Sequence, residues 1–272
     1  NTLLKPVEDF TRQCLDLAAR TSLNQLGAQA GILYDSQGGI TPEPYLATDY
    51  VLKDNTKIPY AIRPPQGNVG TLFFADIPAY PWETFPAIYD NGTLLINEYL
   101  QGYYGINTLT QLTGPGSVQE QLEHAVLAAA TACLDWTIFQ QQGITIAPQT
   151  PDLRVIFGER STTFLLKYPL DVTSTISGTT ARIDSFAVDI PVRMKAILQA
   201  ARATIDQDVT DITFDPSSVT HGTIGITTSR ELSDDILIVT DPSSTIGGKP
   251  YLFQFARKNR APALLWIPNS TT

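Results

Sequence analysis

The chain has 272 residues, a formal net charge of −9 and a pI near 4.6. This acidic balance argues against nucleic acids and anionic lipid surfaces as partners. With two histidines in the chain, a metal or acid–base centre built from imidazoles is not expected. No stretch reaches 18 uninterrupted apolar residues, so we expect no membrane insertion by this chain. Because the chain begins with Asn1 and not Met, we expect that a signal or anchor preceded it.

A first helix is predicted over residues 6–26. Pro6 suits an early helical position, and Glu8 and Asp9 place negative charge in the first turn. Gly27 is expected to help end the helix. The predicted apolar seam consists of Val7, Phe10, Cys14 and Leu17.

An irregular insertion is predicted over residues 50–105, where prolines forbid long helices. Its aromatic residues include Tyr80, Trp82, Phe85, Tyr103 and Tyr104. In one interpretation these rings pack a loop-rich excursion that lacks regular structure of its own. In the other they form a sugar-stacking platform or a contact with a neighbouring subunit.

A central helix is predicted over residues 117–142. Ser117 and Glu120 form a capping box, and apolar residues follow at helical spacing from Leu122 to Trp136. Further apolar residues widen this face to Ile138. We therefore expect most of this helix to be buried between other layers of the fold.

The rest of the chain is predicted to be rich in strands, with one more helix over residues 191–206 that Pro191 opens. The predicted strands are residues 144–147, 154–158, 163–168, 180–189, 223–228, 235–240, 251–256 and 264–267. The fold class is α+β: a single domain over residues 1–272, with helices packed on a mainly antiparallel sheet.

The two cysteines are the most specific chemical signal. Cys14 and Cys133 each lie on the apolar seam of a predicted helix. An even number of cysteines, in a chain expected to have been processed at its N-terminus, favours one disulfide. The alternative is two free buried thiols that act as small apolar side chains.

Several short runs resemble a family of secreted or membrane-anchored cell-surface proteins of small-genome (DPANN-type) archaea. They are Pro6-Val7 with Phe10 and Cys14-Leu15, Leu26-Gly27 with Gln29-Ala30-Gly31-Ile32, Cys133-Leu134 with Phe139 and Gly143-Ile144, Tyr168-Pro169-Leu170, and residues 186–193 and 253–262. Two features depart from the family: Ala30 replaces a glycine, and the usual N-terminal hydrophobic anchor is missing. The resemblance implies an extracellular setting and a paired cysteine, and it implies no particular activity.

Two weaker site signals accompany this setting. Asn91 and Asn269 each begin a glycosylation sequon, which predicts glycans at the surface of an extracellular protein. Asp206, Asp208 and Asp211 form an acidic run that could supply oxygen ligands to Ca²⁺, the only cofactor the sequence suggests. The alternative for this run is a solvated loop without the glycine of a calcium loop.

Three classes of function follow. The first is a non-catalytic extracellular subunit that polymerises with copies of itself into a cell-surface filament, tube, sheath or surface layer. In this class the aromatic insertion and the C-terminal residues Leu264 and Trp266 are the candidate partner contacts. The second class is a cell-surface carbohydrate-binding or adhesive module. The third is a secreted hydrolase whose carboxylates the sequence does not identify. No residue is assigned a catalytic role, and we do not expect an enzyme.

Overall fold

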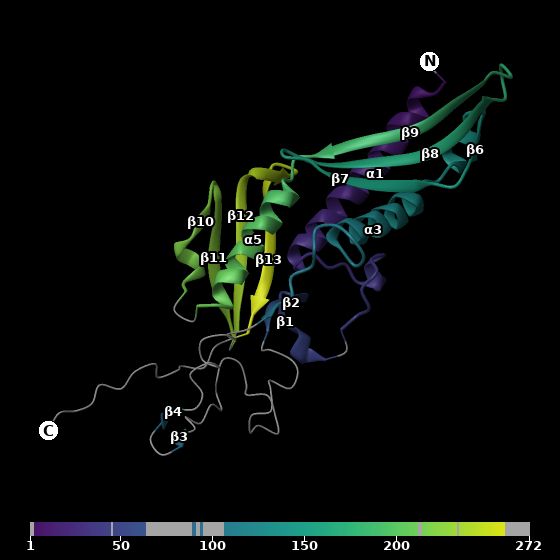
Figure 1. Ribbon diagram of the computed structural model, residues 1–272. Coiled ribbons are helices and arrows are strands. Elements are labelled where there is room, and N and C mark those ends of the chain that lie inside the picture. Colours follow the sequence, from purple (N-terminus) through teal and green to yellow (C-terminus); the bar gives the residue numbers. More distant parts are fainter. Residues whose placement is uncertain are drawn as a thin grey trace.

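The computed structural model describes residues 3–44, 46–63, 89–90, 93–94, 106–211, 214–232 and 234–258. It confirms the predicted fold class, because the described residues form an α+β fold with three long helices and two mainly antiparallel sheets (Figure 1). The helices are α1 (Lys5–Ala28), α3 (Val118–Cys133), α5 (Met194–Asp208) and the single-turn α4 (Thr137–Gln140).

The four-stranded sheet has β8 at its centre and is antiparallel throughout. Its strands are β6 (Ile144–Pro148), β7 (Asp152–Phe157), β8 (Thr162–Ser174) and β9 (Thr180–Ile190). β6 and β7 follow one another along the same side of β8, and β9 lies on the other side. β8 continues past Pro169 and is therefore longer than predicted. Its pairing with β9 shifts register between Lys167 and Leu170, and this irregularity accommodates the proline.

The seven-stranded sheet has the order β1-β2-β13-β12-β11-β10, and β5 also pairs with β2. Its strands are β1 (Tyr50–Lys53), β2 (Thr56–Arg63), β5 (Ile106–Asn107), β10 (Thr220–His221), β11 (Ile224–Glu231), β12 (Asp234–Ile246) and β13 (Lys249–Arg257). The β13–β2 pair is parallel. A separate two-stranded hairpin consists of β3 (Tyr89–Asp90) and β4 (Thr93–Leu94).

The predicted irregular insertion does not begin at Tyr50. Residues 50–63 form β1 and β2 and belong to the seven-stranded sheet. This segment joins the sheet because doing so buries its apolar side chains Val51, Ile58 and Ile62.

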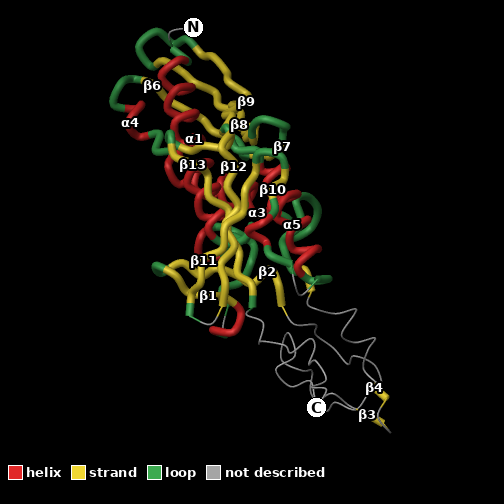
Figure 2. The backbone as a smooth tube through the Cα atoms, turned by 90° about the vertical axis from the view of Figure 1, so that its left-hand side faces the viewer, coloured by secondary structure: helices red, strands yellow, loops and turns green. Residues whose placement is uncertain are grey.

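α1 packs against both sheets, because it contacts β8 and β9 of one and β13 of the other. Its 24 residues correspond to a length of about 36 Å. Figure 2 shows the two sheets following one another along the molecule. A single cluster of buried apolar side chains runs from Phe164 of the four-stranded sheet through Leu15 and Leu23 of α1 to Phe253 of the seven-stranded sheet.

The predicted first helix is confirmed, but its seam differs from the prediction. Leu17 is 61% exposed, whereas Thr11 is fully buried. Thr11 can be buried because its hydroxyl donates to the carbonyl of Val7 at 2.7 Å. Gly27 lies inside α1 instead of ending it, and a Cβ on this residue would come within 2.2 Å of the carbonyl oxygen of Leu252. This helix therefore approaches β13 closely because position 27 carries no side chain.

The predicted central helix is shorter and less buried than expected. α3 ends at Cys133, and Leu134 has an extended conformation with ψ 90°. Asp135 accepts hydrogen bonds from the backbone and the hydroxyl of Thr137, so it competes with a continuous helix and starts α4. α3 packs against α1 and β7 on one side, while its alanines at 128, 129 and 132 are exposed. The expectation of a helix buried between layers is therefore wrong.

The third helix begins at Met194, three residues after the predicted start. Residues 191–193 are held instead against an irregularity in β12. The carbonyl of Pro191 accepts from the amide of Thr245 at 2.9 Å, and the amide of Arg193 donates to the hydroxyl of Ser244 at 2.9 Å. These contacts fix the backbone in a non-helical path before α5 begins.

Candidate functional site

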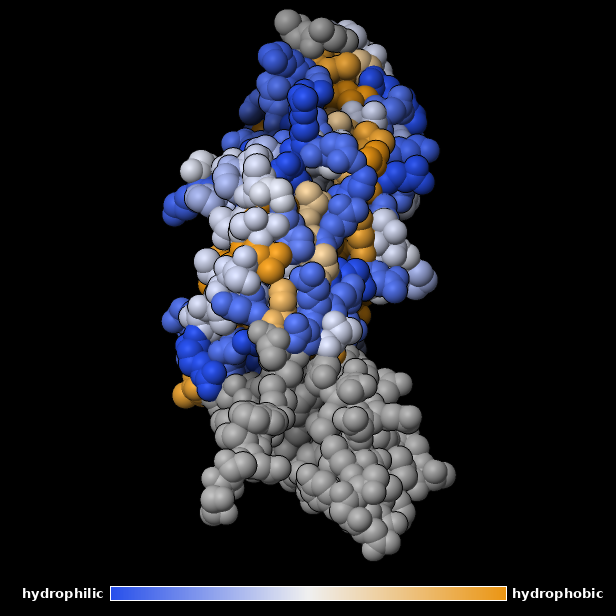
Figure 3. Space-filling view, turned by 60° about the vertical axis from the view of Figure 1, so that its left-hand side comes forward, coloured by the Kyte–Doolittle hydropathy of each residue, from blue (hydrophilic) through white to orange (hydrophobic). Residues whose placement is uncertain are grey.

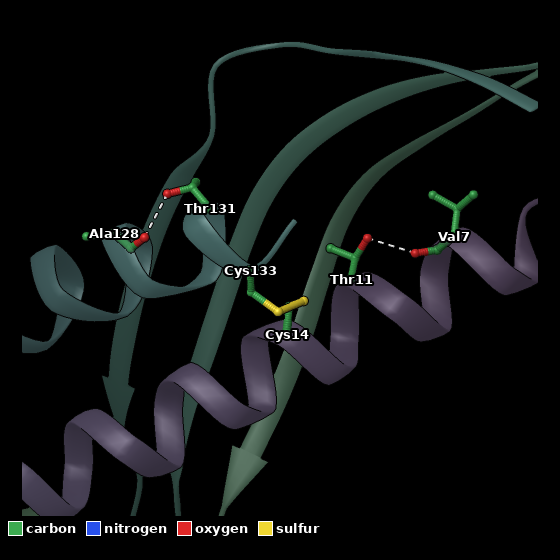
Figure 4. Close-up of a disulfide and its surroundings, with 6 residues drawn as sticks. All are labelled: Val7, Thr11, Cys14, Ala128, Thr131 and Cys133. Atoms are coloured by element: carbon green, nitrogen blue, oxygen red, sulfur yellow. Dashed lines mark hydrogen bonds between the residues drawn. A yellow bond between two sulfur atoms is a disulfide. The ribbon is translucent and has the colours of Figure 1, made fainter. Parts of the chain in front are cut away.

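The predicted disulfide is present. Cys14 and Cys133 are bonded across a sequence separation of 119, and their Cα atoms are 5.7 Å apart. Figure 4 shows the bond joining the middle of α1 to the end of α3. Cys14 is 2% exposed. The bond therefore closes a loop that contains the strands β1 to β5 and ties two helices across their contact.

An aromatic cluster that sequence reasoning missed lies beyond this disulfide. Phe10 of α1 makes edge-to-face contacts with Trp136 and Phe139, at centroid distances of 6.0 and 5.6 Å. Trp136 also lies 6.3 Å from the ring of Tyr168. The cluster packs α4 onto α1 and β8 where the predicted long helix breaks.

The outer edge of the four-stranded sheet is formed by β9. Within the described part of the chain, this eleven-residue strand pairs with β8 alone. Two apolar side chains next to β9 are exposed: Leu165 of β8 at 38%, opposite Ala187, and Ile176 of the β8–β9 turn at 87%. Figure 3 shows apolar surface in a broken band along one face of the molecule. An open strand edge beside exposed apolar side chains has the properties of a strand-pairing surface.

A polar cavity of about 320 Å³ lies between the end of α1, residues 34–43 and the β1–β2 turn. Its lining residues are Gln25, Ala28, Gln29, Tyr34, Gln37, Glu43, Asn55, Thr56 and Lys57. No sequence motif marks this site, because its walls come from segments that fold together only in three dimensions.

The two charged side chains of the cavity are paired with each other. The ammonium of Lys57 donates to Glu43 at 2.6 Å, and the hydroxyl of Ser36 donates to the other carboxylate oxygen at 2.5 Å. The hydrogen bond from Lys57, followed by that from Ser36, lowers the pKa of Glu43. Lys57 also lies 5.8 Å from the ring centre of Tyr34. Burial, with a smaller contribution from Glu43, raises the pKa of the Tyr34 hydroxyl to about 12.

A buried ion pair fixes α5 to β12. Asp241 is fully buried, and Arg193 donates to it through Nε at 2.8 Å and Nη2 at 2.5 Å. Ser244 donates to the same carboxylate at 2.5 Å. Burial raises the pKa of Asp241, but the hydrogen bonds from Arg193 and Ser244 outweigh that effect, so the pKa is lowered overall.

The carboxylates predicted for calcium are not brought together. Asp208 is fully buried and pairs with Arg257 at 2.7 Å, and Asp206 accepts from Asn107 at 2.7 Å. Asp211 is exposed in the turn after α5. In the described ranges no group of three or more His, Cys, Asp or Glu side chains could hold a metal ion. The structure thus gives Asp206 and Asp208 structural partners, and we propose no calcium site here.

The other predicted site residues lie outside the described residues. These are the aromatic residues Tyr80, Trp82, Phe85, Tyr103 and Tyr104, the sequon asparagines Asn91 and Asn269, and the C-terminal Leu264 and Trp266. Their roles remain predictions.

One stretch of the described chain, Val118–Gln140, is long and apolar enough by length and composition to cross a membrane. Core helices of soluble proteins meet the same criterion, but they are mostly buried, whereas 28% of the apolar window in this stretch is buried. α3 is 16 residues long, or about 24 Å, which is shorter than the hydrocarbon core of about 30 Å.

Comparison with known protein families, curated proteins and solved structures gives no match for this chain. The resemblance to archaeal cell-surface proteins is therefore still a prediction.

Proposed function

We propose that this chain is a non-catalytic structural subunit that acts outside the cytoplasm and assembles with copies of itself at a cell surface. The disulfide supports a location outside the cytoplasm, because such bonds persist mainly in oxidising compartments. It joins positions 119 residues apart, so it also stabilises a large part of the chain without a bound partner.

The open edge of β9 is the observation that carries self-association. Its eleven residues extend over about 37 Å. It contains no proline or lysine, two of the residues that protect natural strand edges, although Arg182, Asp184 and Asp189 give it charge. Backbone groups along such an edge can accept a further strand, and main-chain hydrogen bonds then supply the affinity.

The strand donor in this proposal is the C-terminal segment of a second copy, residues 264–272. Leu264 and Trp266 begin this segment in an apolar run, which suits a strand that pairs with the exposed apolar surface beside β9. Fourteen residues follow Lys258, the last described residue. Fully extended, they span up to about 46 Å, which is enough to reach a neighbouring subunit.

The test is sedimentation velocity and negative-stain imaging of four proteins: the full chain, a chain without residues 264–272, Ala187→Lys and Ala128→Lys. Ala187 is exposed on β9, where a hydrated cation opposes pairing with an apolar strand. Ala128 is exposed on α3 and undergoes the same change in charge, so it serves as the matched control.

We expect the full chain and Ala128→Lys to form polymers, and the truncated chain and Ala187→Lys to remain folded and small. A full chain that sediments as a monomer at high concentration would refute self-association. Polymers that survive both the truncation and Ala187→Lys, but are lost in Ala128→Lys, would place the interface on α3 instead.

The carbohydrate-binding alternative also has a supporting observation, which is the polar cavity at the end of α1. The hydrolase alternative has none among the residues that the structure describes.

A further inference from the structure

The cavity between α1 and the β1–β2 turn has walls whose charges cancel. Glu43 uses both carboxylate oxygens, one with Lys57 and one with Ser36. The ammonium of Lys57 also lies 5.6 Å from the ring of Tyr50 and 5.8 Å from that of Tyr34. A phosphate or carboxylate ligand would have to compete with Glu43 for this ammonium, and a cationic ligand would have to displace it. The charges therefore favour a neutral ligand.

Side-chain amides dominate the remaining lining. Gln25, Gln29, Gln37 and Asn55 come from α1, the following loop and the β1–β2 turn, and Thr56 adds a hydroxyl. The amide oxygen of Gln37 already accepts from the backbone amide of Tyr34 at 3.0 Å. Amide side chains carry both donor and acceptor groups, which matches a ligand whose hydroxyls both donate and accept. The volume of about 320 Å³ lies at the lower end of the range of about 300–1,000 Å³ for ligand pockets.

Gln29 provides an independent observation, which is a buried polar atom without a hydrogen-bond partner among the described residues. It is 5% exposed, and its Oε1 is buried with no hydrogen-bond partner among the described residues. Native proteins leave few buried polar atoms in this state. Because the side chain also lines the cavity, a small rotation toward a ligand hydroxyl would give this acceptor a donor.

We infer that this cavity binds a neutral, hydroxyl-rich ligand of the size of one saccharide unit. Gln29 would accept from a ligand hydroxyl, and Gln25 and Asn55 would bond to others across the cavity. The inference is independent of self-association, since the cavity lies at the β1–β2 turn and not at β9.

The test uses ligand-observed NMR with the methyl glycosides of glucose, galactose, mannose and N-acetylglucosamine, and with inorganic phosphate as a charged probe. Gln29→Met keeps the size of the side chain but removes the amide. Asn55→Gly removes an amide at a position with φ 62°, which glycine adopts without strain. Gln13→Met, at an exposed position on α1, is the matched control.

We expect at least one glycoside to bind more tightly than phosphate. Its affinity should fall about tenfold in Gln29→Met and severalfold in Asn55→Gly, and stay unchanged in Gln13→Met. The inference is overturned if no glycoside binds below about 10 mM, or if binding survives in both cavity variants while each remains folded by circular dichroism. Tighter binding of phosphate than of every glycoside would also overturn it.

Discussion

Removing the disulfide is the perturbation whose size the structure defines best. The bond spans a sequence separation of 119, for which the chain-entropy relation gives about 16 cal/mol/K, or about 5 kcal/mol at room temperature. Cys14 is buried, so truncation to alanine also leaves a small cavity. Measured values fall below the relation when the unfolded chain keeps structure. We expect Cys14→Ala/Cys133→Ala to lose about 3–5 kcal/mol of unfolding free energy.

Urea denaturation followed by circular dichroism measures this loss. The m-value should rise in the double variant, because an unfolded chain without the cross-link exposes more surface. The wild type under reducing conditions is the control and should match the double variant. A loss below about 1 kcal/mol with an unchanged m-value would refute the reasoning, because the cross-link would then not restrict the unfolded chain.

Two further predictions test the packing of α1 and α5. In Gly27→Ala the added methyl group meets the carbonyl of Leu252, so thermal unfolding should show a loss of about 1–3 kcal/mol of unfolding free energy. Gly225→Ala is the control, because its Cβ meets nothing within 4 Å, and it should lose much less. Equal losses in the two variants would contradict the close contact. Asp241→Asn leaves Arg193 without its charged partner and should cost about 3–5 kcal/mol at neutral pH. Because the pKa of Asp241 is lowered in the folded state, its stabilisation is present above its unfolded pKa of about 3.9 and is lost as the pH falls through the folded pKa. The variant should therefore show a weaker loss of stability in acid than the wild type, and parallel pH profiles would count against this assignment.

The sequence by itself determined the fold class and most element positions. Helical spacing located α1, α3 and α5 to within a few residues, apart from the C-terminal end of the central helix. The hydroxyl of Ser117 accepts from the amide of Glu120 as the capping box requires, although the carboxylate of Glu120 bonds to the amide of Gly116. Alternating and apolar runs located most of the later strands, and the predicted strand at residues 264–267 lies outside the described residues. These features depend on residues that are close together along the chain, which is why sequence reasoning finds them.

The cysteine pair was also within reach of the sequence, because the chain has two cysteines and both lie on predicted apolar seams. The sequence did not determine which side of α3 is buried. An alanine-rich helix has nearly the same apolar character around its circumference, so contacts with α1 and β7 decided which alanines face solvent.

Tertiary structure alone decided the remaining features. β2 pairs in parallel with β13, nearly two hundred residues later, and that register depends on long-range packing. In the acidic run at the end of α5, Asp208 is buried because Arg257, from β13, reaches it. The cavity formed because the end of α1, the following loop and a turn meet without filling the space between them. Local sequence fixes which backbone conformation a segment prefers, but contacts between distant segments decide which side chains end up buried, paired or exposed.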